Sequence, residues 1–126
     1  MNIPEDLKYT SDHEWIRLND GVAEVGITDF AQRELGDIVY VDVPSLNKTL
    51  AQHEVFGTIE AVKTVSDLFL PISGEIIELN PLLEKTPDII NQDPYRDGWV
   101  VKIKVLKPTE LDTLLDAATY KSHVGA

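Results

Sequence analysis

One lysine, Lys63, has the clearest chemical potential in this chain. No other lysine or arginine occurs between residues 49 and 84. Runs rich in β-branched residues on both sides predict a hairpin over about 54–70 with this lysine near its tip. The ε-amine there could be a solubilising turn group held loosely by Glu60 or Asp67, or an attachment point that another enzyme acylates. Spacing alone favours the turn group.

The other residue types offer little catalytic chemistry. The chain has no cysteine, which excludes disulfides, thiolate catalysis, iron–sulfur clusters and cysteine-based zinc sites. His13, His53 and His123 lie far apart in the sequence, and the motifs of serine nucleophiles and phosphate-binding loops do not occur. A composite catalytic site assembled by folding is the minor alternative, and any redox group has to be supplied from outside the chain.

The composition indicates a single acidic domain, 1–126. The chain has 22 acidic and 11 basic side chains, a net charge of -11, and 43% hydrophobic residues. Such acidity disfavours nucleic acid and anionic membranes, which bind clustered cations. The start of the chain has no basic segment followed by an apolar run, and no apolar stretch approaches the roughly 20 residues of a membrane span. We therefore expect a cytoplasmic protein with cationic or neutral partner surfaces.

The spacing of apolar residues predicts a mostly β fold with two helical segments. Breaks at Gly, Pro and Asn occur about every 8 to 12 residues, as in all-β domains. We expect strands at 13–18, 21–27, 38–43, 54–62, 65–70, 74–79 and 99–106. Thr28 can cap a short helix that ends at Gly36, and apolar spacing predicts an amphipathic helix over about 109–119. Residues 80–98 are expected to form a long loop.

A series of short motifs runs in order along nearly the whole chain. They are Leu7-Lys8-Tyr9, His13-Glu14-Trp15, Val25-Gly26-Ile27-Thr28-Asp29, Ala31-Gln32, Leu35-Gly36-Asp37, Val41-Asp42-Val43-Pro44, Phe56-Gly57, Glu60-Ala61-Val62-Lys63, Ser66-Asp67, Pro71-Ile72-Ser73-Gly74-Glu75, Asn80-Pro81, Asp93-Pro94-Tyr95 and Gly98-Trp99. Together they resemble the lipoyl-carrying H protein of the glycine cleavage system. Several motifs in one order over one domain are far more specific than a lone Glu-x-Val-Lys.

The resemblance implies a fold and a function. The fold would be a flattened barrel or sandwich of two antiparallel sheets, a lipoyl/biotinyl-like hybrid motif, with lipoate in amide linkage on Lys63 and Glu60 contributing to recognition for lipoylation. The protein would not be an enzyme. It would carry the aminomethyl group and reducing equivalents between a pyridoxal-phosphate glycine decarboxylase, a tetrahydrofolate-dependent aminomethyltransferase and dihydrolipoamide dehydrogenase. A lipoate ligase or transferase would modify it.

The resemblance also implies a cleft that holds the loaded arm. Glu14 and Asp67 are placed to meet the protonated amine, because a carboxylate is the natural partner of that group, and Asp12 could add to the same negative region. His13 is expected to be structural. The family usually has Ser at the position of Ala61 and a small pair where this chain has Thr64-Val65, which could alter ligase docking or the folding back of the arm.

Three alternatives to a glycine cleavage carrier stay open on the sequence. An H-like lipoyl protein in lipoate relay or another sulfur pathway would use the same hairpin. A biotin carrier has the same topology, but the usual Met-Lys-Met setting is absent, since Val62 and Thr64 flank Lys63. An unmodified interaction domain would carry no group at all. A freely moving carrier is expected to be a monomer.

Overall fold

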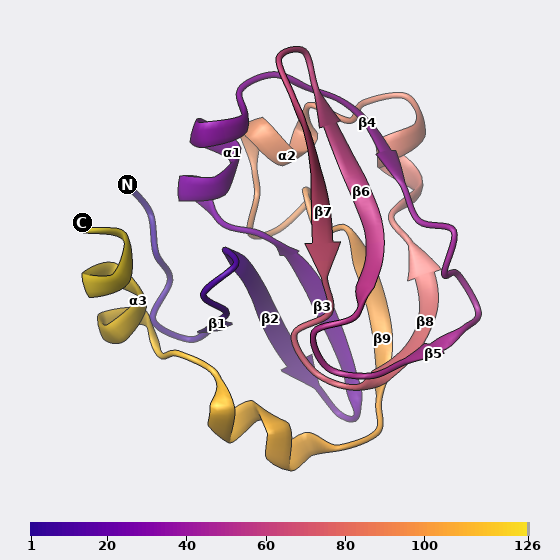
Figure 1. Cartoon of the computed structure of the whole chain (residues 1–126), viewed down its shortest axis with the longest axis vertical. Helices are drawn as coiled ribbons and strands as arrows, with labels where there is room; N and C mark the ends of the chain where they lie inside the picture. Colours follow the sequence, from indigo (N-terminus) through magenta and orange to yellow (C-terminus); the bar gives the residue numbers. More distant parts are fainter. Residues whose placement is uncertain (126) are drawn as a thin grey trace.

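Two antiparallel sheets form the body of the computed structural model, which describes residues 1–125 (Figure 1). The strands are β1 (Lys8–Tyr9), β2 (Glu14–Asn19), β3 (Val22–Ile27), β4 (Ile38–Asp42), β5 (Thr49–Leu50), β6 (Val55–Ala61), β7 (Val65–Phe69), β8 (Gly74–Leu79) and β9 (Val101–Val105). The larger sheet has the order β1-β2-β3-β9-β8-β5, and the smaller has the order β4-β6-β7. The expected mostly β fold of two antiparallel sheets is confirmed.

The core lies between the inner faces of the two sheets. Alternation along β9 shows how the sequence directs this packing: Val101 and Ile103 are fully buried, whereas Lys102 between them is half-buried and Lys104 is exposed. Ile59 and Leu68 of the smaller sheet belong to the same buried cluster. Because successive side chains of a strand point to opposite faces, each sheet buries one face in this cluster.

A short helix, α1 (Asp29–Leu35), links the two sheets. The Thr28 hydroxyl accepts a hydrogen bond from the Ala31 amide at 3.2 Å, so it satisfies one of the free donors of the first turn. The helix ends at Gly36, whose φ of 79° is a conformation that glycine adopts without strain. Both predicted boundaries of this helix are confirmed.

Residues 80–98 contain more regular structure than the expected loop. A 3-10 helix, η1 (Pro81–Glu84), and a short helix, α2 (Ile89–Gln92), interrupt the segment. Leu83 and Ile90 anchor them, because both side chains are buried in the core cluster. Pro81, one of the prolines that indicated a loop, instead occupies the first turn of η1.

The C-terminal region also differs from the single helix expected over 109–119. A 3-10 helix, η2 (Pro108–Thr113), is followed by extended residues and then by a separate helix, α3 (Ala117–Val124). Leu115 pairs with β1, and the Asp116 carboxylate caps α3 by accepting from the Thr119 amide at 2.8 Å. The expected continuous helix is wrong because the backbone pairing of Leu115 divides it.

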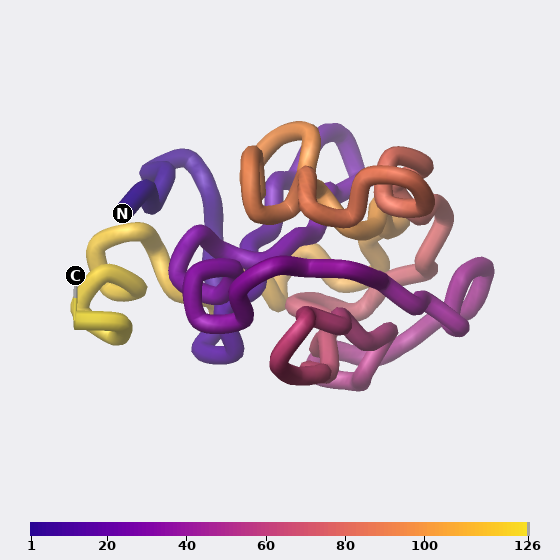
Figure 2. Tube along the Cα trace, turned by 90° about the horizontal axis from the view of Figure 1, so that it is seen from above, coloured from indigo at the N-terminus to yellow at the C-terminus, as the bar shows by residue number. Residues whose placement is uncertain are grey.

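Helix α3 packs at the end of the molecule where the chain begins, and both termini lie there (Figure 2). A second buried cluster joins it to the N-terminal segment. The members of that cluster are Ile3, Leu7, Tyr9, Trp15, Tyr95, Ala117 and Tyr120. The N-terminal segment from Ile3 and helix α3 are therefore packed against the larger sheet.

Candidate functional site

Lys63 lies at the tip of the β6–β7 hairpin, which extends beyond the rest of the smaller sheet (Figure 1). The Ala61 amide donates to the Thr64 carbonyl at 2.8 Å, closing a tight turn around Val62 and Lys63. Both turn side chains are exposed. The ε-amine is therefore accessible to a modifying enzyme.

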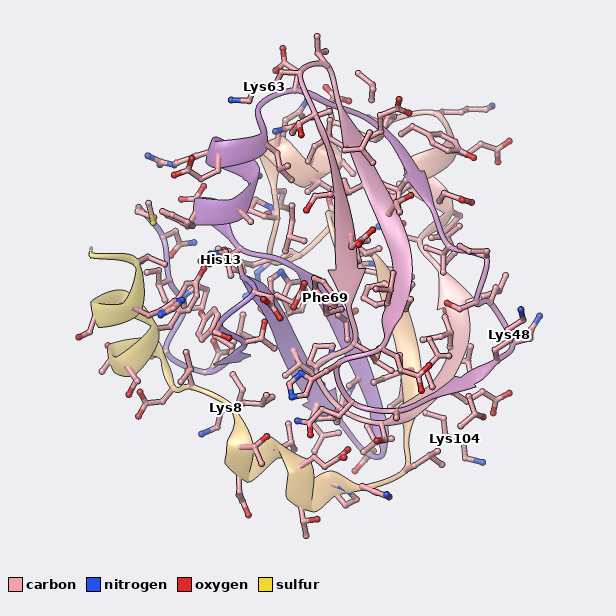
Figure 3. The ribbon with its side chains drawn as sticks, in the orientation of Figure 1. Lys8, His13, Lys48, Lys63, Phe69 and Lys104 are labelled. Atoms are coloured by element: carbon pink, nitrogen blue, oxygen red, sulfur yellow. The ribbon has the colours of Figure 1, made fainter. Side chains whose placement is uncertain are left out.

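The stem of Lys63 leans toward the end of α1 rather than straight away from the hairpin (Figure 3). A methyl group placed on Gly36 would lie 3.6 Å from the lysine Cε and 4.0 Å from its Nζ. The lysine thus lies beside the C-terminus of α1. Leu35, the last residue of that helix, lines a cleft.

The cleft is a cavity of about 270 Å³ between α1, β7 and the loop that joins β1 to β2. It is lined by Asp12, His13, Glu14, Ile27, Phe30, Ala31, Glu34, Leu35, Ile59, Ser66, Asp67 and Leu68. The structure therefore brings together the three carboxylates singled out in the sequence, although Asp67 is more than 50 residues from the other two. The remaining wall is largely apolar.

Glu14 is the most deeply buried carboxylate of the cleft, with 2% of its surface exposed. One oxygen accepts a hydrogen bond from the Thr10 hydroxyl at 2.7 Å, and the other accepts from the Phe69 amide at 3.2 Å. Phe69 is the last residue of β7, an edge strand of the smaller sheet, and Figure 3 places it at the opposite end of that strand from Lys63. The carboxyl is therefore held rigidly at one end of the cleft.

Burial raises the pKa of Glu14 from 4.5 to about 8, and the neighbouring Asp12 contributes in the same direction. The ion pairs described for residues 1–125 do not include Glu14. A buried carboxyl without a cation favours its protonated form. Arrival of a cationic group in the cleft would favour loss of that proton.

Asp12 and Asp67 are exposed and lie at the mouth of the cleft. Asp67 pairs with Thr58 across the β6–β7 ladder, and Asp12 lies in the β1–β2 loop. Their charges add to the negative field of the cleft, but water screens exposed carboxylates more than it screens a buried one.

Glu60 lies in a different place, on the outer face of the hairpin next to the tip. It pairs with Tyr40 of β4 on one side and with Val65 of β7 on the other. All three side chains are exposed, including 56% of Tyr40 and 60% of Val65. Glu60 therefore does not join the cleft carboxylates but forms part of a surface beside the lysine.

His13 contributes to the cleft although the sequence indicated only a structural residue. Its φ of 71° turns the backbone into β2, and its ring packs 4.7 Å from that of Phe30. Burial and the nearby His123 lower the pKa of His13, so the ring beside the carboxylates is neutral at neutral pH. The contact between His13 and Tyr120 could not be predicted from the sequence, because 107 residues separate the two.

Other features of the described residues do not provide a competing site. No group of three or more His, Cys, Asp or Glu side chains within residues 1–125 could hold a metal ion. No helix in that part of the chain is long and apolar enough to cross a membrane. A larger cavity, about 350 Å³, is lined by N-terminal residues and the segment around Tyr95, and its lining includes neither Lys63 nor any residue of the cleft.

Comparison with known proteins places these features in a family. The family model for the glycine cleavage H-protein matches residues 7–125. The chain is 58% identical to the glycine cleavage system H protein of Bacteroides fragilis over the full length of both chains. It is 61% identical to that of Pelodictyon phaeoclathratiforme over 99% of both.

The fold agrees with the sequence comparison. The crystal structure of a glycine cleavage system H protein from Mycobacterium marinum superimposes with a TM-score of 0.87 at 39% identity, covering 98% of this chain and 100% of that chain. The chain belongs to the glycine cleavage H-protein family, the non-catalytic carrier component of the glycine cleavage system.

Proposed function

We propose that this chain carries lipoate in amide linkage on Lys63 and shuttles the aminomethyl group and reducing equivalents of glycine cleavage. Its partners would be glycine decarboxylase, aminomethyltransferase and dihydrolipoamide dehydrogenase, with a lipoate ligase or transferase attaching the group. The observation that carries the proposal is the exposed lysine at a hairpin tip beside a cleft with a buried carboxyl. We propose that the protein is a monomer, because a free carrier has to visit several enzymes. We also propose a cytoplasmic location.

The residues present fit a lipoyl arm. The Lys63 stem already lies against Gly36 at the end of α1, so a longer chain on the same amine has a surface to follow. From there Leu35, Ala31 and Leu68 offer apolar contact along the cleft wall. Apolar surface removed from water stabilises the folded-back arm by about 25 cal/mol per Å².

When bound, lipoate would supply the disulfide that the chain lacks, since no cysteine occurs in the sequence. The protein's own contribution is to shelter the cargo and hold its amine. Glu14 is the main candidate, because its carboxyl is buried and fixed by Thr10 and Phe69. In a site with little water, a hydrogen bond between an ammonium and this carboxylate would be stronger than the same bond in solution.

The proton of Glu14 is part of this proposal. With its pKa at about 8, the carboxyl of the empty carrier is largely protonated at neutral pH. A protonated amine at the end of the arm would stabilise the carboxylate, so Glu14 would release its proton when the arm docks. Asp67 and Asp12 would contribute the weaker attraction of exposed charges at the cleft mouth.

Glu60 would act earlier, when the modifying enzyme recognises the hairpin. It is exposed one row below the turn, between Tyr40 and Val65. An enzyme that acylates the Lys63 amine has to cover the adjoining surface, so a charge there can contribute to recognition. Thr64 and Val65, which stand where the family usually has a pair of small residues, are also exposed. Their larger side chains therefore lie on the surface.

Two measurements test the proposal. Intact mass of the native chain should show one lipoyl group, and the mass should be absent from Lys63→Arg. The lipoylated chain added to glycine decarboxylase should then support exchange of the glycine carboxyl with bicarbonate. A lipoyl mass without exchange would favour the lipoate-relay alternative, whereas an unmodified native Lys63 would contradict both.

A further inference from the structure

The hydroxyl of Tyr120, which does not itself line the cleft, connects two of its walls, the β1–β2 loop and the start of α1. Tyr120 is fully buried on α3. Its hydroxyl oxygen lies 2.8 Å from Nδ1 of His13 and 2.7 Å from the hydroxyl of Thr28. Burial raises the pKa of Tyr120 to about 12, so the hydroxyl keeps its proton and can donate one hydrogen bond while accepting another.

Each partner of this hydroxyl belongs to a different wall. Thr28 caps α1, the helix that supplies the apolar wall of the cleft. His13 directly precedes Glu14 and itself lines the cavity. The Thr28 amide also donates to the His13 carbonyl at 3.0 Å, so the Tyr120 hydroxyl adds a second link at a point where the two walls already meet.

Helix α3 is well placed to make this link rigid. Leu115, just before the helix, exchanges two backbone hydrogen bonds of 2.8 Å with Tyr9. The Tyr120 ring stacks on the Tyr9 ring with centroids 4.7 Å apart and planes 11° apart. At the other end of the helix, the His123 ring nitrogen lies 3.2 Å from the Ser11 carbonyl, in the same β1–β2 loop as Asp12.

From this geometry we infer that Tyr120 is a positioning residue for the acidic end of the cleft, acting through His13 and Thr28. The inference rests on the proposed carrier function. The hydroxyl keeps the Asp12–Glu14 segment at a set distance from α1, so that water is excluded when the arm is docked. The C-terminal helix then belongs to the cargo site even though α3 contributes no residue to the lining of the cavity.

The chain offers a matched pair of variants for the test. Tyr120→Phe removes the hydroxyl that touches His13 and Thr28 while retaining the stacked ring. Tyr9→Phe removes the other hydroxyl of the same stacked pair, whose hydrogen bond goes to the Pro4 carbonyl. Both variants lose one hydroxyl from a fully buried tyrosine, so Tyr9→Phe controls for the general cost of removing a buried hydroxyl from this pair.

The first readout is leakage of cargo from the lipoylated full chain after loading, followed as ammonia release without partner enzymes. Tyr120→Phe removes both hydrogen bonds behind the cleft but none to the cargo itself, so ammonia release should be about three- to tenfold faster than in wild type. Tyr9→Phe should remain close to wild type. Equal release from the two variants would overturn the inference.

The second readout uses the unmodified chain, so it does not depend on loading. Ring-nitrogen resonances of His13 should shift in Tyr120→Phe and keep their wild-type positions in Tyr9→Phe. Unchanged His13 resonances in Tyr120→Phe would contradict the positioning role. A wild-type carrier that leaks as fast as loaded free lipoamide would instead show that the cleft gives no protection, and the proposed shelter would fail together with the inference.

Discussion

The hairpin tip and the acidic end of the cleft contrast in how they are held. Lys63 is exposed in a turn held by backbone hydrogen bonds, one that closes it and one from the Val62 amide to the Asp37 carbonyl at 3.0 Å. Glu14 is buried, and its two oxygens bind groups from the β1–β2 loop and from β7. The tip is exposed, whereas the carboxyl at the far end of the cleft is shielded from solvent. The proposed carrier would use both, because its cargo would have to be delivered and protected in turn.

The largest expected effect is at the tip. Lys63→Arg retains the charge but removes the acylatable amine, so lipoylation should be lost completely while the far-ultraviolet circular dichroism and the melting temperature stay near wild type. Intact mass spectrometry after incubation with lipoate ligase provides the measurement. A lipoyl mass on this variant would show that another of the eight lysines is the acceptor.

At the cleft end, the largest effect should be a dependence of stability on pH. The folded pKa of Glu14, about 8, lies above the ordinary value of 4.5. Folding therefore favours the protonated carboxyl. The stability from this preference is complete below pH 4.5 and is lost as the pH rises through 8. Relative to Glu14→Gln, which does not titrate, wild type should lose roughly 3 to 5 kcal/mol over that interval.

Urea unfolding of the unmodified wild type and Glu14→Gln at several pH values between 4 and 9 measures this difference. The comparison removes the contributions of other titrating groups, since both chains share them. A difference that stays constant over the whole interval would mean that Glu14 is ionised in the folded protein at neutral pH.

Glu14→Gln should also weaken retention of the loaded arm. The amide preserves size and one acceptor oxygen but removes the negative charge, so ammonia release should rise roughly ten- to hundredfold, the equivalent of one charged hydrogen bond. Asp67→Asn is the control at the exposed mouth, where an effect of about two- to threefold is expected for a screened charge. If Glu14→Gln and Asp67→Asn raised ammonia release equally, the amine would be retained by the overall negative charge of the cleft rather than by a specific contact with Glu14.

The smallest effect should be at the outer face of the hairpin. Glu60→Gln should slow lipoylation severalfold without changing leakage from the loaded carrier, since Glu60 lies outside the cleft. Asp42→Asn is the matched control, because Asp42 pairs with Thr58 two residues further from the tip. Initial rates of lipoylation under limiting ligase would separate the two, and equal rates would remove Glu60 from recognition.

Local features of the sequence were sufficient for the parts of this fold that depend on neighbouring residues. Thr28 and Gly36 set the ends of α1 through capping and a left-handed backbone angle, both of which operate within a few residues. The C-terminal helix could not be placed in the same way. Leu115 satisfied a helical pattern, but its pairing with Tyr9 across the molecule outweighed that pattern.

The candidate site divides along the same line. The sequence alone determined that Lys63 lies in a hairpin turn and that the carboxylates are of the right type for an amine, because turn formation and side-chain chemistry are local properties. Only the tertiary structure decided that Glu14 is buried against Phe69, that Glu60 points away from the cleft, and that Tyr120 reaches His13. Burial and long-range hydrogen bonds arise when distant segments pack together, and no spacing along the chain encodes them directly.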